Sequence, residues 1–437
     1  MVPDIFHRDF TPTPYWGEAY RPTPSNLVDV PKAARVAIVG GGYAGLSTAL
    51  ELAKHGIEAV VLEANELGFG ASTRNGGAVS GGVNIGKSFT GRPADVEPER
   101  AERLLSDASD AFALIDRLIE EEKIDCFWEK PGRFVGAWTK KHFDTQTQRL
   151  AVLNSAAQSG AYVVPRERQR EEIASDYYFG GMVVERSGKL HPALYYQGLL
   201  EACRRRGVPV CAKAPVVGIR RSGAGWHVET GRGTVSAGDV VIATNGYTGG
   251  LTPALRRRVV PVASHIIATE ELAQDLARLL IPKARTLSDT KRVLCYYRMS
   301  PDGRRVVFGG RARFTQVDPT VSAPILYRYM TNRFPQTRGV KVTHAWTGNV
   351  AFTLDALPHM GERDGLHYCL GCNGSGVAMM TYLGWQTARK IARVANYACS
   401  YDSEDFPDHP LYTGKPWFLP VVGSYYRLRD NLDRLLA

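Results

Sequence analysis

The sequence predicts an α/β protein with two sheets: a parallel sheet assembled from segments far apart in the chain, and a second, mostly antiparallel sheet. Three observations lead to this prediction. A strand-helix-strand pattern occupies residues 34–64, and a second glycine-rich helix start follows residue 370. Between them, residues 251–340 alternate strand-like and helical runs without a glycine fingerprint.

The strand-helix-strand pattern contains three glycines at the spacing G-x-G-x-x-G. Gly40 permits a tight turn, Gly42 lets the backbone approach a pyrophosphate, and Gly45 lets the helix close on the strand. Strand, turn and helix occur in the order that this motif requires. The segment therefore predicts a Rossmann-like domain that binds a dinucleotide.

The residues beside this turn fit the same ligand. Tyr43 and Ala44 begin the helix, whose free N–H groups would face phosphates. Glu63, followed by Ala64, ends the next apolar strand. A carboxylate there accepts hydrogen bonds from ribose hydroxyls and repels a 2′-phosphate, so we expect an adenine dinucleotide without that phosphate.

A second glycine-rich run follows at residues 68–82. Glycines at this density favour neither helix nor strand, so the chain is expected to pass close to the ligand. The candidate contacts in this run are Gly70, Ala71, Ser72, Thr73, Arg74, Asn75, Gly76 and Gly77.

The middle of the chain supplies scaffold and one further contact segment. Periodicity predicts helices at 98–124, 142–158 and 193–206, and strands at 134–138, 216–221, 226–230 and 238–243. The last strand ends at Thr244, Asn245 and Gly246, which would face the ligand crevice of a parallel sheet.

Residues 251–340 are expected to form the substrate sheet, with strands at 259–269, 292–299 and 304–310 and helices at 271–280 and 324–334. Tyr296 and Arg298 share one strand face. Arg298 or Arg311 could pair with a substrate carboxylate, and His265 could act as a base. The alternative is that all four are ordinary structural residues.

The final segment returns to ligand contacts. Trp346, Gly348 and Asn349 precede a second glycine turn and could line the pocket. That turn contains Gly371, Asn373, Gly374, Ser375, Gly376 and Val377 and opens a helix through residue 393. Two glycine-rich helix starts this far apart suggest one extended ligand held at both ends, and FAD is long enough.

Taken together, these blocks resemble the D-amino acid oxidase/glycine oxidase family of flavoproteins, and within it amine oxidases of the γ-glutamylputrescine oxidoreductase type. The resemblance rests on residues 39–46, 70–77, 191–192, 308–311 and 371–377. It implies that Val217 meets the adenine through its backbone and that residues 374–377 aim a helix N-terminus at the flavin pyrimidine.

The resemblance also implies a reaction. An amino acid or a secondary or polyamine-type amine would lose hydride to flavin N5 and give an imine that water hydrolyses. FAD is expected to be non-covalent. Relatives of the sarcosine oxidase type carry a lysine that helps oxygen react, whereas Val306, Val307 and Phe308 stand in the corresponding strand here. The electron acceptor is therefore either oxygen or a quinone-like carrier.

Composition limits the remaining possibilities. The net charge is +10, but the basic clusters at 204–206 and 256–258 lack a recognition motif and predict solvated surface, not a nucleic-acid site. Seven scattered cysteines argue against a disulfide framework, and Cys369 and Cys372 have no second pair at metal spacing, so no metal is expected. Neither a membrane span nor a secretion signal is apparent, which favours a cytoplasmic location.

The expected organisation has seven segments: an N-terminal extension (1–33), FAD-binding parts at 34–97, 186–250 and 341–398, a helical and substrate-domain segment (98–185), a substrate domain (251–340) and a C-terminal extension (399–437). Two other functions stay open. One is a 2-hydroxy acid dehydrogenase on the same scaffold, which would need His265 as a base. The other is a non-catalytic nucleotide-binding module.

Overall fold

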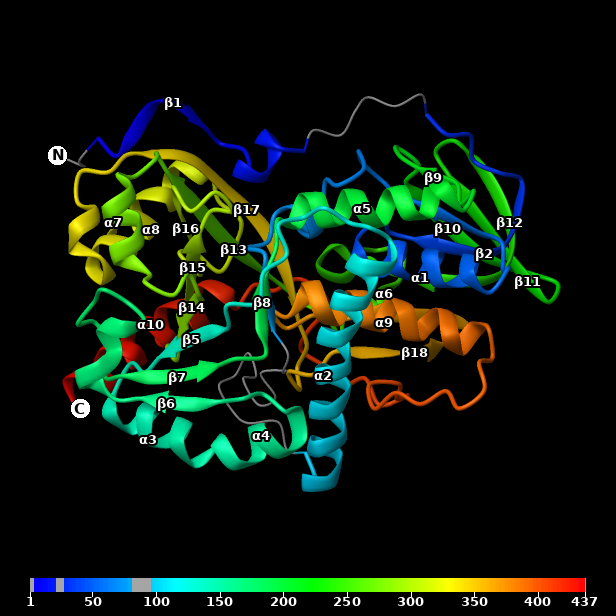
Figure 1. Ribbon diagram of the computed structural model, residues 1–437. Helices are drawn as coiled ribbons and strands as arrows, with labels where there is room; N and C mark the ends of the chain where they lie inside the picture. The colour runs from blue at the N-terminus through cyan, green and yellow to red at the C-terminus, as the bar shows by residue number, and fades with distance from the viewer. Residues whose placement is uncertain (1–3, 21–26, 81–95, 437) are drawn as a thin grey trace.

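A computed structural model describes residues 4–20, 27–80 and 96–436. Gly81 and Gly82 of the second glycine run lie outside these ranges. Figure 1 shows two halves side by side, each built around one large sheet, with both chain ends on the same side of the molecule.

The predicted parallel sheet is present and is assembled from distant segments. Its strand order is β10-β11-β12-β2-β3-β9, and β19 pairs with β12 and with β18. Pairing is parallel at its centre, for β12–β2, β2–β3, β3–β9 and β12–β19, and antiparallel for β10–β11, β11–β12 and β18–β19. The bounds are β2 (Ala33–Val39), β3 (Ala59–Leu62), β9 (Val210–Cys211), β10 (Val216–Ser222), β11 (Gly225–Thr230), β12 (Gly233–Ile242), β18 (His359–Arg363) and β19 (Leu366–Leu370).

Three helices pack together on one face of this sheet. They are α1 (Tyr43–Lys54), α5 (Pro192–Arg205) and α9 (Gly376–Ile391), and α1 contacts both others. The long α2 (Pro98–Glu121) packs against α9. The largest apolar core lies between these helices and the sheet, which fixes the two helix starts beside each other.

The second sheet has nine strands in the order β1-β17-β13-β16-β15-β14-β5-β7-β6. All of its pairs are antiparallel except β1–β17 and β14–β5, so the prediction of a mostly antiparallel sheet is confirmed. The bounds are β1 (Phe6–Thr11), β5 (Arg133–Gly136), β6 (Tyr162–Val164), β7 (Gly181–Val184), β13 (Val260–Thr269), β14 (Thr286–Asp289), β15 (Cys295–Met299), β16 (Val306–Gly310) and β17 (Val342–Phe352).

The remaining elements flank these sheets. They are the two-stranded antiparallel sheet of β4 (Ala78–Ser80) and β8 (Ser187–Lys189) and helices α3 (Lys140–Gln148), α4 (Leu150–Ala157), α6 (Pro253–Arg256), α7 (Gln274–Leu280), α8 (Pro319–Arg333) and α10 (Leu419–Leu435). Short 3₁₀ helices occupy Tyr15–Glu18, Ala71–Thr73, Arg166–Glu171, Asn245–Tyr247 and Pro335–Thr337.

Some local predictions were wrong. The single helix expected at 142–158 is two helices, α3 and α4. The helix expected from residue 324 starts at Pro319, because Asp318 caps it by accepting a hydrogen bond from Thr320 N at 2.8 Å. The basic cluster at 256–258 is not wholly solvated, since Arg258 is buried and pairs with Asp408 at 3.1 Å.

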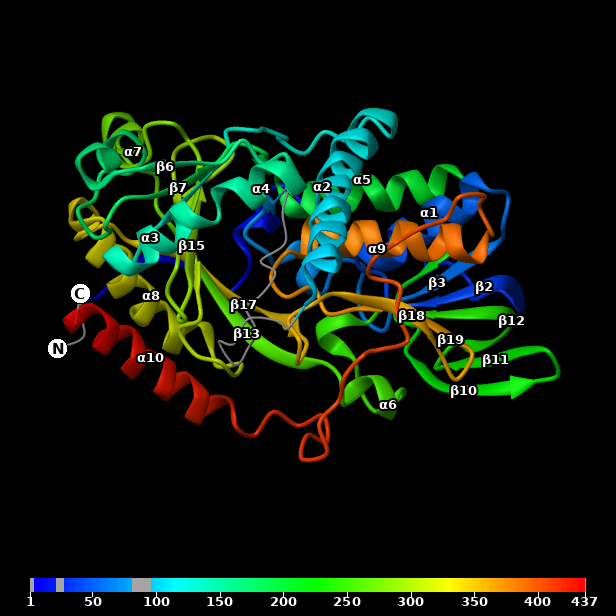
Figure 2. The ribbon, with the colours of Figure 1, turned by 90° about the horizontal axis from the view of Figure 1, so that it is seen from below.

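The predicted segment boundaries stay a prediction, but the sheets show where the outer segments belong. β1 comes from the expected N-terminal extension and pairs with β17 in the nine-stranded sheet. β17 itself follows residue 340, where a return to the first sheet was expected, yet it pairs along most of β13. The two long strands β13 and β17 thus carry the nine-stranded sheet towards the parallel sheet (Figure 2), and β17 contacts the 3₁₀ helices at Ala71–Thr73 and Asn245–Tyr247.

Candidate active site

Two adjoining cavities lie between the two halves of the molecule. One, the turn cavity, has a volume of about 450 Å³ and surrounds the first glycine turn. The other, the sheet cavity, has a volume of about 180 Å³ and lies against the nine-stranded sheet. Residues that line both are Ala71, Asn75, Asn349, Val350, Gly374 and Gly376. The cavities therefore form one elongated cleft to which both glycine-rich runs and the second glycine turn contribute.

The first glycine turn lies at one end of the cleft. Gly40 has φ +107°, a conformation that favours glycine, and Gly42, Tyr43 and Ala44 line the turn cavity beside it. A Cβ on Gly45 would stand 1.9 Å from the Gly40 carbonyl oxygen. Gly45 thus brings α1 against β2 rather than touching the cavity, which is the packing role predicted for it.

Glu63 faces the same cavity with its carboxylate already oriented. Oε2 accepts a hydrogen bond from Gly41 N at 2.9 Å, and Oε1 accepts one from Asn65 N at 2.9 Å. An ionised carboxylate has about four acceptor positions, so two remain for ribose hydroxyls. Ala64 lines the cavity next to it.

The loop 70–77 is held from three directions. Trp16 Nε1 donates to Asn75 O at 2.8 Å, and Trp346 Nε1 donates to Arg74 O at 2.8 Å. Arg298 Nη1 donates to Gly77 O at 3.2 Å and to Leu190 O at 2.7 Å. Inside the loop, Asn75 Nδ2 donates to Ala71 O at 3.2 Å and to Ser72 O at 3.0 Å. The loop is therefore a preformed wall of the cleft.

The end of β12 and the second glycine turn meet at the opposite wall. Asn245 Oδ1 accepts a hydrogen bond from Gly371 N at 3.0 Å, and Thr244, Asn245 and Gly246 line the turn cavity. Gly374 has φ +92°, and no described atom lies within 4 Å of a Cβ built on it, so a side chain there would enter the cleft. Within the described chain, no side chain caps the start of α9 just beyond it.

These features fit a flavin dinucleotide. The N-termini of α1 and α9 both open on the cleft, and their N–H groups favour negative charge. Gly42 and Gly374 have no side chain, so each leaves room in the cleft for atoms of a ligand. Glu63 supplies the hydrogen-bond acceptor for a ribose. The loop 70–77 spans the distance between the two ends.

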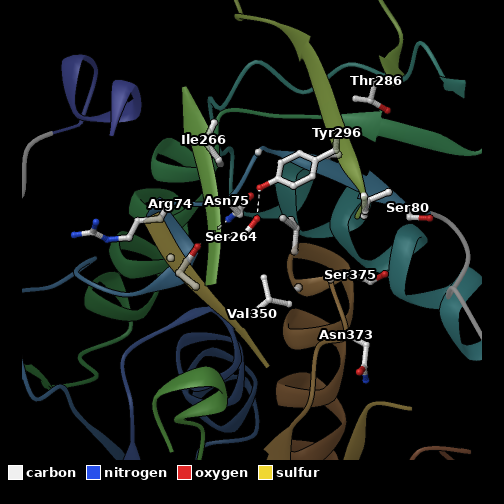
Figure 3. Close-up of a pocket in the computed structure, with 18 of the residues that line it drawn as sticks. Arg74, Asn75, Ser80, Ser264, Ile266, Thr286, Tyr296, Val350, Asn373 and Ser375 are labelled. Carbon is white, nitrogen blue, oxygen red and sulfur yellow. Dashed lines mark hydrogen bonds between the residues drawn. The ribbon is translucent and has the colours of Figure 1, made fainter. Parts of the chain in front are cut away.

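The sheet cavity is walled by strands of the nine-stranded sheet. Tyr296 from β15 points into it, and its hydroxyl lies 2.8 Å from Ser264 Oγ on β13 (Figure 3). Burial raises the pKa of Tyr296 to about 12, so the phenol stays protonated at neutral pH. Asn373 and Ser375 of the second glycine turn also line this cavity, and the Asn373 amide donates to Gly371 O at 2.8 Å.

Four arginines, Arg74, Arg133, Arg298 and Arg311, line the sheet cavity, whereas none of its described lining residues is an Asp or Glu. Their hydrogen bonds run to uncharged oxygens, including Ser288 Oγ for Arg133 at 2.6 Å and Arg292 O for Arg311 at 3.2 Å. Burial lowers the pKa of Arg133 and Arg298 to about 10, which leaves both protonated at neutral pH. The cavity is therefore positively charged.

The four guanidinium groups are not equivalent. Arg74 donates to Phe69 O at 2.7 Å and to Thr347 O at 3.3 Å, and its side chain points away from the cavity (Figure 3). Arg298 is 2% exposed, and its Nε and Nη1 are occupied by the carbonyls of Met299, Gly77 and Leu190. It holds the loop through these atoms, and its remaining nitrogen, Nη2, is buried without a hydrogen-bond partner among the described residues. Arg133 and Arg311 keep accessible surface in the cavity and are the two available for an anionic group.

Most predicted contact residues line the cleft, but some do not. His265 lies between Ser264 and Ile266 on β13, so its side chain points to the opposite sheet face from the cavity. Trp346 supports the loop from behind. Val217 bulges out of β10 with 67% exposure, and Pro215 and Val216 line the turn cavity in its place. Those absent from both linings are Gly45, Thr73, Gly77, Val217, His265, Trp346 and Gly371.

Other lining residues were missed by the sequence reasoning. Arg133 precedes the strand expected at 134–138, to which no site role was assigned, and only the parallel pairing of β5 with β14 brings it to the cavity. Ser264 and Thr286 were missed for the same reason. Their signal was period-two alternation along β13 and β14, which predicts a shared face but not which face.

The fold and the cleft define an FAD-binding oxidoreductase. The profile of the DAO family, described as FAD dependent oxidoreductase, matches residues 35–390. The chain belongs to this family and is therefore an FAD-dependent enzyme, as its motifs predicted.

Two curated relatives are similar over most of their length. Gamma-glutamylputrescine oxidoreductase of Escherichia coli is 32% identical, over 97% of this chain and 99% of the relative. Glycine oxidase of Geobacillus kaustophilus is 25% identical, over 82% and 93%. These relatives confirm the resemblance on which the sequence interpretation rested.

Solved structures show the same fold at lower identity. L-proline dehydrogenase from P. horikoshii matches with a TM-score of 0.72 at 17% identity, covering 85% of this chain and 97% of that one. Glycine oxidase from Geobacillus kaustophilus matches with a TM-score of 0.71 at 20% identity, covering 87% and 99%.

Two further features concern the remaining expectations. In the part of the chain that the structure describes, no helix has the length and apolar character needed to cross a bilayer. Cys369 and Cys372 are buried free thiols, and Cys372 lines the turn cavity. The cytoplasmic location stays a prediction.

Proposed function

We propose that the enzyme oxidises the C–N bond of an amine or amino acid whose structure also carries a carboxylate. The observation that carries this proposal is the sheet cavity, in which Arg133 and Arg311 face the same space without an acidic residue among the described lining. A guanidinium in such a site recognises a carboxylate through charge-assisted, often bidentate, hydrogen bonds. The E. coli relative, whose name refers to gamma-glutamylputrescine, supports an amine as substrate.

The cleft would hold FAD along its length. The first glycine turn and Thr244–Gly246 would contact the pyrophosphate, Glu63 the adenosine ribose, and the start of α9 the flavin ring. We infer non-covalent binding, since no histidine lines either cavity within the described chain and the thiol of Cys372, the cysteine in the described lining, is buried against Ala351 O at 3.7 Å. When bound, the flavin supplies the two-electron oxidation of the substrate.

The protein's own part is to bind and orient. Arg133 or Arg311 fixes the carboxylate, and the hydroxyl pair of Tyr296 and Ser264 offers a donor and an acceptor to the amine nitrogen. An amine that binds neutral needs no general base, and the resulting imine is hydrolysed by water. Val262, Ile266 and Val350 supply an apolar lining that limits water around the reacting C–H bond.

The runner-up, oxidation of a 2-hydroxy acid, lacks such support. It requires a base for the hydroxyl proton, and the residue predicted for that task was His265. Because His265 faces away from the cavity, the proposed base is not in reach of a ligand there. We therefore propose the amine reaction alone.

The test is anaerobic reduction of the purified, flavin-loaded protein. Substrates are offered in pairs that differ in the carboxylate: gamma-glutamylputrescine with N-(4-aminobutanoyl)putrescine, 4-aminobutyrate with butylamine, and glycine with methylamine. We expect the flavin to bleach with at least one carboxylated amine and much more slowly with its partner that lacks the carboxylate. Bleaching by 2-hydroxy acids only, or equal bleaching by both members of every pair, contradicts the proposal.

A further inference from the structure

The C-terminal helix α10 has an apolar stripe on its outer side. The stripe consists of Trp417, just before the helix, and Val421, Tyr425, Leu428, Leu432 and Leu435, which are between 39% and 81% exposed. Figure 2 shows α10 running along an outer edge of the molecule. Scattered exposed apolar residues are ordinary, but a continuous row of this length marks an interaction surface.

The spacing of the stripe is that of a coiled-coil seam. From Val421 onwards the apolar residues follow one another at intervals of four, three, four and three positions. This alternation keeps a narrow row on one side of a helix and is the pattern by which one helix packs lengthwise on another. A helix that only covers its own domain needs no second apolar row.

A separate face of α10 is already used for packing on the body of the protein. Asp430 accepts hydrogen bonds from Arg292 N at 3.1 Å and Val293 N at 2.9 Å. A Cβ on Gly423 would stand 2.7 Å from the Phe314 ring, so the helix lies close against it. These contacts hold the stripe outward, because the buried and exposed rows lie on opposite sides of the helix.

The polar residues beside the stripe indicate a protein partner. Membrane-surface helices have a polar face rich in Lys and Arg. Here the stripe is flanked by Ser424 and Asn431 on one side and by Arg429 on the other, whereas Arg427 and Arg434 donate to Ala312 O and Trp138 O on the body of the protein. With Leu436, which is 85% exposed, the row offers roughly 700 Å² of side-chain surface, close to the ~800 Å² per partner of a standard specific interface.

We propose that two copies of this chain associate through their α10 stripes. An all-apolar row is complementary to itself, and twofold pairing of identical surfaces is the commonest form of oligomer. The stripe also lies beyond residues 35–390, the span matched by the flavoenzyme family, so this surface is separate from the family's shared domain.

The test is the solution mass of the full-length, flavin-loaded protein by light scattering after size exclusion, across a dilution series. We expect twice the chain mass of 48.0 kDa for the native protein. The variant Leu428→Glu with Leu432→Glu places two charges in the seam and should raise the dimer dissociation constant by roughly 100-fold or more. The matched control is Leu279→Glu with Val321→Glu, at sites of similar exposure on α7 and α8, and should stay dimeric.

Melting temperature and flavin content verify that both variants are folded. A native protein that is monomeric at every concentration overturns the proposal. So does a seam variant that dimerises like the control. The alternative of membrane binding is tested by sedimentation with phosphatidylglycerol vesicles. A monomer that binds these vesicles through the stripe also overturns the proposal.

Discussion

Replacing Arg311 by methionine tests how the sheet cavity recognises its substrate. Methionine keeps an unbranched apolar side chain over Phe352, above which the guanidinium now lies at 4.7 Å, but it removes the charge. A hydrogen bond to a charged group contributes about 1.5–3 kcal/mol. Loss of that interaction in the transition state corresponds to a fall of about 10- to 150-fold in kcat/KM for a carboxylated amine.

The assay compares two substrates on each enzyme. The carboxylated amine that reduces the flavin fastest is measured beside its neutral primary amide, and kcat/KM is obtained for the native enzyme, Arg311→Met and Arg133→Met. If an arginine binds the carboxylate, its variant loses activity selectively towards the charged substrate and changes the amide by less than about threefold. Equal losses for both substrates in both variants would refute the assignment of these arginines.

Three further predictions concern the cofactor, stability and the electron acceptor. Gly45→Ala should abolish flavin binding or folding because its Cβ meets the Gly40 carbonyl at 1.9 Å, whereas Gly17→Ala, with open space around it, should keep a native flavin-to-protein absorbance ratio. Burial lowers the pKa of His265 to about 4, so below about pH 6.5 the unfolded chain binds a proton that the folded protein does not. Lowering the pH from 7 to 5 should therefore reduce the free energy of unfolding by about 2 kcal/mol through this group. The variant His265→Gln should show a smaller drop in melting temperature over the same pH range. Because Val307 rather than a lysine lines the cavity, flavin reduced by substrate should regain its colour more slowly in air than with a soluble quinone, and rapid reoxidation in air would contradict this.

The cofactor cleft could be predicted from the sequence because its parts are local. Gly40 and Gly374 each adopt a positive φ within a short turn, and such turns leave a direct trace in the residues. Strand, glycine turn and helix also follow one another without interruption at both sites. The sequence further predicted that the two turns meet on one ligand, and the shared lining of the two cavities confirms that they converge.

The substrate side could be predicted only in part, because it depends on pairing between distant strands. Tyr296 was correctly placed because its own strand was recognised. On β13, however, the choice between His265 and its neighbour Ser264 depends on the register with β16 and β17, and a shift of one residue reverses it. Arg133 reaches the cavity only through the pairing of β5 with β14.

The support of the loop 70–77 shows the same limit. Trp16 belongs to a segment expected to be an N-terminal extension, yet it is fully buried and bonds to the loop. Trp346 and Arg298 were expected to face the ligand, whereas both hold backbone carbonyls of that loop. The type of a residue predicts which hydrogen bonds its side chain can make. Only the folded structure shows whether those bonds go to a ligand or to the backbone of the protein.

The most direct measurement is the titration of FAD into protein stripped of flavin, with ADP and riboflavin as competitors. We expect one FAD per chain, displaced by either fragment, because each would occupy one end of the cleft between Gly42 and Gly374. A chain that takes up no FAD, or FAD that neither fragment displaces, would contradict a single dinucleotide held at both ends.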